Sequence, residues 1–128
     1  MRNWNLRDLV KTVRAVAAEF PNRKYSACDD EGRQLVSCFY GEHRQFDGDP
    51  TRCIIGEALH RLGETEHPTW DKHTPSVYEL LTSTPWGFCF DASAPELSWL
   101  RSVQQQQDGG TPWGMAVAAA DAAFPKIC

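Results

Sequence analysis

Thr51-Arg-Cys-Ile-Ile-Gly-Glu-Ala-Leu-His-Arg-Leu-Gly63 carries the most consistent helical pattern in the chain. Its apolar residues recur at the spacing of one broad helical face, while the polar residues fall on the other sides. Asp49 can accept hydrogen bonds from the first free amides, and Pro50 suits the first helical position because it has no N–H to leave unpaired. Gly63 can take the left-handed conformation that commonly closes a helix. These features predict a central helix over residues 50–62.

Four further helices are indicated by apolar residues at helical spacing and by capping or breaking residues at their ends. The first covers residues 6–20, with Asn5 as its cap and Pro21 as its stop. The others are expected from Pro75 to Leu81, from Ser93 into the glutamine run 104–107, and from Pro112 to Phe124.

Three details of these helices lead to specific predictions. Gly56 lies inside the central helix, where glycine costs about 1 kcal/mol relative to alanine, and we interpret it as a point where another segment crosses closely. Ser93 and Glu96 have the spacing of a capping box. Residues 104–107 are four glutamines, which we interpret as a solvated helix face.

The segment from Lys24 to Tyr40 has a different character. Two short runs of strand-prone residues flank Asp29-Asp-Glu-Gly32, a turn signal whose glycine can supply a positive φ. We therefore predict a β-hairpin that packs on the central helix, because a hairpin alone is marginal in water. The expected fold is α+β and predominantly helical, with about five helices in one globular domain over residues 1–128.

Length, charge and cysteine content favour a protein of the cytoplasm. No apolar run approaches the roughly 20 residues that span a bilayer, and charges occupy the N-terminal positions where a signal peptide needs its apolar core. We therefore expect no membrane contact. The five cysteines are odd in number and irregularly spaced, which fits a compartment where thiols stay reduced.

A basic cluster on the first helix raises the question of nucleic-acid binding. It consists of Arg2, Arg7, Lys11 and Arg14, in a chain whose formal net charge is −4. Nucleic-acid-binding domains usually carry a basic stripe and a positive net charge. We interpret the cluster as a solvated helix face and do not expect a nucleic-acid partner.

Residues 53–63 read Cys-Ile-Ile-Gly-Glu-Ala-Leu-His-Arg-Leu-Gly, and residues 100–117 read Leu-Arg-Ser-Val-Gln-Gln-Gln-Gln-Asp-Gly-Gly-Thr-Pro-Trp-Gly-Met-Ala-Val. These two segments resemble small uncharacterised proteins encoded by actinobacteria and their bacteriophages. The resemblance covers roughly residues 52–121. It implies a phage-related origin and no activity, because that family has none to carry over.

Two sets of residues could hold a metal ion. Glu57 and His60 are three residues apart on one predicted helix, which is the spacing used in carboxylate-bridged di-iron sites. Such sites need a second copy of the pair, and the sequence has none. His67 and His73 are further apart than paired zinc ligands usually are. We interpret all four residues as ordinary polar positions and expect no metal.

A nucleophile built from a cysteine and a histidine is harder to exclude, because its members need only meet in space. Cys28 or Cys38 could approach His43, and His60 faces outward from the central helix. A small enzyme or ligand-binding domain with these residues, in a pocket between hairpin and helix, is therefore the rival hypothesis. No phosphate-binding loop or dinucleotide fingerprint is present, and we expect no cofactor.

Aromatic residues support the hypothesis that we favour, which is protein recognition without catalysis. Trp70 lies in the long loop 64–74, and Trp86, Phe88 and Phe90 alternate along residues 84–92. Tryptophan is enriched among the residues that dominate protein interfaces. Trp4 and Trp113 also fall in loops or at helix ends, where a large ring can sit half exposed, although any single one of these rings is better interpreted as covering the core. The sequence therefore predicts a small interaction or regulatory protein that binds a host protein or self-associates through these aromatic loops.

Overall fold

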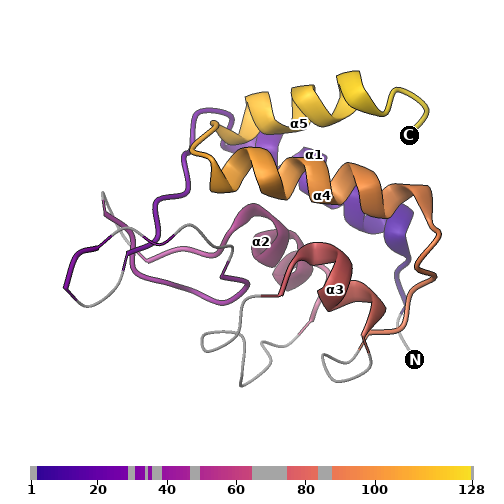
Figure 1. Cartoon of the computed structure of the whole chain (residues 1–128), viewed down its shortest axis with the longest axis horizontal. Coiled ribbons are helices and arrows are strands. Elements are labelled where there is room, and N and C mark those ends of the chain that lie inside the picture. The colour runs from indigo at the N-terminus through magenta and orange to yellow at the C-terminus, as the bar shows by residue number, and fades with distance from the viewer. Residues whose placement is uncertain are drawn as a thin grey trace.

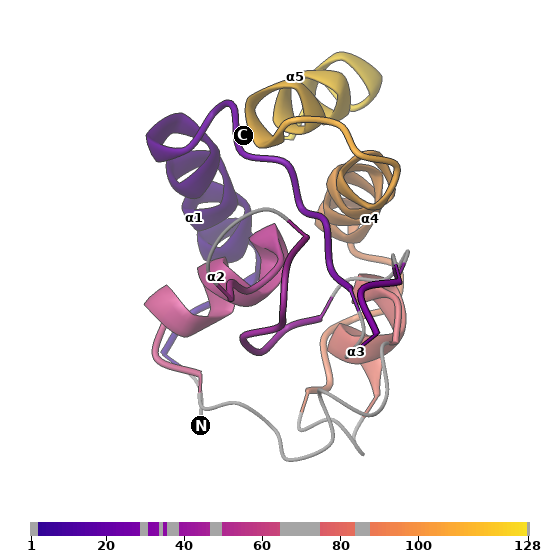
Figure 2. The same ribbon diagram turned by 90° about the vertical axis from the view of Figure 1, so that its left-hand side faces the viewer.

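The computed structural model describes residues 3–28, 31–33, 35, 39–46, 50–64, 75–83 and 88–127. Five helices lie within these ranges, as the sequence predicted (Figure 1): α1 (Leu6–Glu19), α2 (Ile54–Arg61), α3 (Val77–Thr82), α4 (Pro95–Asp108) and α5 (Trp113–Ala123). Figures 1 and 2 show α1, α4 and α5 in one half of the molecule and α2 and α3 in the other. Helix α4 packs against each of the other four helices, so it organises the fold more than α2 does.

Helix α1 begins and packs as its sequence indicates. The Asn5 side chain accepts a hydrogen bond from the Asp8 amide, and the Asp8 carboxylate accepts one from the Asn5 amide, both at 2.9 Å. This reciprocal cap satisfies two amides that would otherwise lack partners at the start of a helix. The apolar stripe from Leu6 to Ala17 is buried.

Helix α2 is shorter than predicted. It begins at Ile54, and its N-cap is Cys53 instead of Asp49, which lies outside the described residues. Thr51 is in extended backbone, where it exchanges two hydrogen bonds of 3.0 Å with His43. Gly63 follows the helix with a φ of +89°, as expected for a closing glycine.

Gly56 lies where another segment crosses α2 closely, as the sequence indicated. A Cβ atom at this position would lie 2.6 Å from the Cα atom of Tyr40. The backbone around Tyr40 therefore packs directly on α2, and only glycine leaves it room.

The predicted β-hairpin and the α+β class are wrong. The described residues contain no strand and only two isolated bridges, Ala27 with Gln45 and His43 with Thr51. Side chains take up amides that a sheet would have paired: Gln45 accepts from the Ser26 amide at 2.8 Å and Tyr25 from the Phe39 amide at 3.2 Å. The fold of the described part is all-α, and the described residues between positions 25 and 53 form no helix or strand.

Two predictions about α4 are also wrong. The capping box at its start is absent, because Ser93 bonds to the Asp91 carboxylate and Ala94 is the N-cap. The glutamine run is only partly solvated, because Gln104 and Gln107 are buried. Their side chains cap other helices: Gln104 accepts from the Val77 amide at 2.8 Å and Gln107 from the Ile54 amide at 2.7 Å.

Candidate functional site

The aromatic residues of the predicted interaction loops are divided by the structure. Trp70 and Trp86 lie outside the described residues. Phe88 is buried, and Phe90 is partly buried beside Trp4, with ring centroids 5.3 Å apart. Trp4 is buried and bonds through its indole N–H to the Glu64 carboxylate at 3.0 Å. These three described rings contribute to the core and do not form an exposed patch.

The tryptophans that the structure describes are not half exposed. Trp4, Trp99 and Trp113 are the tryptophans among the described residues, and all three are buried. The three rings are buried because the helices of a small domain have few other side chains large enough to fill the space between them.

Among the described candidates, Cys28, His43 and His60, no cysteine is arranged with a histidine as a nucleophile and its base. The ring of His43 stacks on Phe39, with centroids 3.8 Å apart, and its Nε2 atom lies 3.1 Å from the backbone carbonyl of Cys28. Cys28 is a buried free thiol, and His60 is exposed on α2. Cys38 lies outside the described residues.

The metal candidates do not converge either, as far as they are described. Glu57 is 4.0 Å from Arg52, and His60 points to solvent from the next turn. His67 and His73 lie outside the described residues. Within the described ranges, no group of three or more histidine, cysteine, aspartate or glutamate side chains could hold a metal ion.

Cys53 departs from the expectation of reduced thiols, because it is disulfide-bonded. Its sulfur also accepts a hydrogen bond from the Gly56 amide at 3.4 Å. Disulfides are typical of oxidising compartments and uncommon in the cytosol. The cytoplasmic location therefore stays a prediction.

Helix α5 carries the most distinctive surface among the described residues. From Trp113 to Ala123 its only charged residue is Asp121. One side of the helix is buried through Trp113, Ala116, Val117 and Ala120. The opposite side is formed by Met115, Ala118, Ala119 and Ala122, and Met115 is 64% exposed. A helix that is apolar on all sides is usually covered on all sides.

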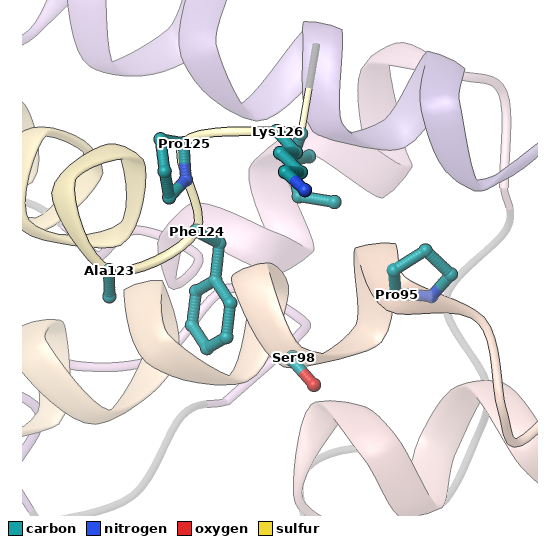
Figure 3. Close-up of a pocket in the computed structure, with 7 residues that line it drawn as sticks. Pro95, Ser98, Ala123, Phe124, Pro125 and Lys126 are labelled. Carbon is teal, nitrogen blue, oxygen red and sulfur yellow. The ribbon is translucent and has the colours of Figure 1, made fainter.

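A pocket of about 380 Å³ lies at the C-terminal end of α5 (Figure 3). Its walls come from two elements: Pro95 and Ser98 of α4, and residues 123–127 at the end of α5 and beyond it. Figure 3 shows the Phe124 ring lying over α4, with Lys126 on the other side of the opening. A pocket of this volume is within the range of small-molecule sites.

The wall of this pocket is fixed by a joint between three helices. Arg14 of α1 donates to the Asp121 carboxylate at 2.7 Å and to the Ile127 carbonyl at 2.8 Å. Trp99 of α4 donates to the same Asp121 oxygen at 2.9 Å, and the Arg14 guanidinium lies 5.0 Å from the Trp99 ring centroid. The turn at 124–127 is closed by a 3.2 Å bond from the Ile127 amide to the Phe124 carbonyl. These contacts connect the turn that forms this wall to α1 and, through Asp121, the end of α5 to α4.

Neither surface was identified from the sequence. The outer face of α5 had a usable signal, because a helix with one charge in eleven residues is too apolar for an exposed position. The pocket had no such sequence signal. The Arg14–Asp121 pair spans 107 positions, and no local pattern identifies Asp121 as the partner of Trp99. A second pocket, of about 370 Å³, includes one predicted interaction residue, Phe90, and the start of α1.

Comparisons with protein-family models, curated proteins and solved structures find no match to this chain. The resemblance to actinobacterial and phage proteins therefore stays a prediction. Across the described residues, no helix is long and apolar enough to cross a membrane.

Proposed function

We propose that the protein acts by protein–protein contact and that its first partner is a second copy of itself, bound through the outer face of α5. The observation that supports this is the apolar character of α5 on the side where the described residues leave it uncovered. The aromatic loops keep their predicted role only through Trp70 and Trp86, which the structure does not describe.

The arrangement of the face suits a symmetric pair. Met115, Ala118 and Ala122 are spaced by three and four residues, so they form one stripe along the helix. Alanine lets two helix axes approach to about 8 Å, the short end of the usual range. Asp121 is held by Arg14 on the flank, so two copies can meet without burying a charge from this stripe. A two-fold axis through Ala118, the middle of α5, places the same residues in contact from both copies.

The contact is small, and its affinity should reflect this. Eleven residues of helix extend about 16 Å, which gives less area than the roughly 800 Å² per partner of a standard stable interface. We therefore expect weak, concentration-dependent association, with a Kd in the micromolar range or above.

Sedimentation velocity of the untagged chain over a wide concentration range tests this proposal. The native protein should shift from monomer toward dimer as its concentration rises. Ala118→Arg should weaken the association about tenfold or more, because it places two like charges at the two-fold axis. Because Ala118 is exposed, we expect the variant to stay folded, and circular dichroism checks this.

The matched control is Ala18→Arg, the same substitution at an exposed alanine of α1. It should leave the association unchanged. A native protein that stays monomeric at every concentration would refute self-association, and equal effects of the two substitutions would refute the assignment to α5.

A further inference from the structure

We propose that the second pocket, between the first turn of α1 and residues 90–96, binds a small zwitterion, namely an α-amino acid with an apolar side chain. The starts of α1 and α4 lie at the same end of the molecule (Figure 1), and both contribute to this pocket. Its volume of about 370 Å³ is within the range of small-molecule sites. None of the described residues that line it belongs to the outer stripe of α5, so this inference does not depend on self-association.

The apolar part of the pocket is formed by Leu6, Phe90 and Ala94. Phe90 and Ala94 are only partly buried against the core, so both keep a surface that a ligand can cover. Transfer of an apolar side chain from water onto this surface favours binding in proportion to the area covered. An aromatic ring can also pack against the ring of Phe90. The walls therefore favour an apolar side chain, and an aromatic one most.

Opposite charges come from the two walls of the pocket. Arg7 belongs to the first turn of α1, whereas Asp91 and Glu96 belong to the segment on the other side. Within the described ranges, the side chains of Arg7 and Glu96 form no hydrogen bond and no ion pair. Hydrogen bonds from the Ser93 amide and hydroxyl lower the pKa of Asp91, so its carboxylate is charged at neutral pH. The pocket therefore presents one cation and two anions that do not neutralise one another by contact.

A free α-amino acid matches this distribution of charge. Its carboxylate can accept two parallel hydrogen bonds from the guanidinium of Arg7. Its ammonium has three donors, which the carboxylates of Glu96 and Asp91 can accept. Both Ser93 bonds go to one oxygen of Asp91, Oδ1, so among the described residues the other oxygen is left for the ligand. A simple anion would be repelled by the two carboxylates, and a simple cation would be repelled by Arg7.

The affinity should be modest, because the charged groups of the pocket are in contact with solvent. Arg7 and Asp91 are exposed, and Glu96 is partly exposed. Ion pairs at such positions contribute little each. We expect a Kd on the order of 1 mM for an amino acid such as phenylalanine, on the binding free energy per atom usual for drug-sized molecules.

The experiment is a titration of the full ¹⁵N-labelled chain with L-phenylalanine at neutral pH, followed by NMR. The amides of Leu6, Arg7, Phe90 and Glu96 should shift together and give one Kd. Phenethylamine, which lacks the carboxylate, and 3-phenylpropanoate, which lacks the ammonium, should each bind several-fold more weakly. L-Alanine, which lacks the ring, should also bind more weakly, because it covers less apolar surface.

Two charge variants test the two ends of the ligand separately. Arg7→Gln should weaken the binding of phenylalanine and 3-phenylpropanoate about two- to fivefold, the range of exposed ion pairs, and should not weaken that of phenethylamine. Glu96→Gln should weaken the binding of phenylalanine and phenethylamine by a similar factor and should not weaken that of 3-phenylpropanoate. A general loss of folding cannot produce this crossed pattern, because it would weaken all three ligands alike.

A third variant tests the cavity itself. Ala94→Leu places a larger side chain in the pocket and should abolish the binding of all four ligands. Ala92→Leu, at an exposed alanine two positions earlier that does not line the pocket, is the matched control and should bind like the native protein. The dispersion of the amide spectrum checks that both variants are folded.

The result that supports the proposal is a common Kd at the pocket amides together with the crossed pattern of the two charge variants. The absence of a saturable shift at these amides, or equal effects of Ala94→Leu and Ala92→Leu, would overturn the site. Phenethylamine or 3-phenylpropanoate binding as tightly as phenylalanine would overturn the assignment of a zwitterion.

Discussion

The Asp108 carboxyl group shows how one residue makes stability depend on pH. Burial disfavours its charged form and raises its pKa to about 6, although a hydrogen bond from Gln107 partly opposes the rise. The folded pKa therefore lies above the unfolded value of about 3.9. Protonation stabilises the folded state fully below the unfolded pKa, and this stabilisation is lost as the pH rises through 6.

Asp108→Asn should therefore stabilise the protein above pH 6 and have little effect near pH 4. Asparagine removes the charge and can still accept the Gln107 hydrogen bond. Because the carboxyl is only half-buried, solvent screens part of the difference, and we expect a gain of about 1 kcal/mol. Urea unfolding of both proteins between pH 4 and pH 8 measures this difference in the free energy of unfolding. A difference that does not vary with pH would contradict the raised pKa of Asp108.

Asp91 provides a control of opposite sign. Hydrogen bonds from the Ser93 amide and hydroxyl lower its pKa, so its contribution to stability is present at neutral pH and is lost as the pH falls through the lowered pKa. Asp91→Asn should lower the free energy of unfolding slightly at neutral pH and have less effect in acid.

Gly56 tests whether packing outweighs helix propensity at a single position. Alanine is favoured over glycine by about 1 kcal/mol in a helix interior, but here its Cβ atom would lie 2.6 Å from the Cα atom of Tyr40. We expect Gly56→Ala to destabilise the protein by about 2 kcal/mol, as overpacking usually does. Gly109→Ala, where the nearest atom would be 3.5 Å away, should be close to neutral. Chemical unfolding gives the free energy of unfolding of both variants. A Gly56→Ala variant more stable than the native protein would refute the close packing of the Tyr40 backbone on α2.

At the scale of elements, α4 acts as a cap for two other helices. Gln104 accepts from the first amide of α3 and donates to the Tyr40 hydroxyl at 2.7 Å, which in turn donates to the Pro75 carbonyl. Gln107 accepts from the first amide of α2 and donates to Asp108. Each glutamine therefore uses both ends of its amide inside the protein, where an unpaired amide is costly.

Removing either glutamine should loosen the helix that it caps. Gln104→Leu should leave the Val77 amide unpaired and speed hydrogen exchange in α3. Gln107→Leu should leave the Ile54 amide unpaired and speed hydrogen exchange in α2, and each should cost about 1–3 kcal/mol. Gln105→Leu, at an exposed neighbour in the same run, is the control. Equal loosening of α2 and α3 by both variants would contradict this division.

The sequence predicted elements that depend on local pattern. The five helices, the Asn5 cap, the Gly63 stop and the Gly56 crossing follow from the spacing of apolar residues and from the chemistry of a few end residues. The hairpin failed because strand-prone composition does not choose a pairing partner. Here side chains of Gln45 and Tyr25 replaced the expected ladder bonds.

At the scale of the molecule, most features that failed prediction join distant segments; the capping box at Ser93 and Glu96 is a local exception. Four consecutive glutamines look alike in sequence, yet the packing of α4 buries Gln104 and Gln107 and exposes Gln105 and Gln106. Trp4 and Phe88 seemed suited to an interface, but the space between the helices required large side chains. The pocket depends on contacts between α1, α4 and the turn at 124–127, which no local pattern encodes.

The joint of Arg14, Trp99 and Asp121 also has a consequence for folding kinetics. Its bond from Arg14 to the Ile127 carbonyl connects positions 113 residues apart. Contacts of such long range require a large loop to close before they contribute, and proteins rich in them fold slowly. Among the five helices, α1 leaves the ribosome first and α5 leaves it last. The buried stripe of α1 is therefore fully covered only after α5 has been synthesised. Until then that stripe is the surface on which a chaperone would act.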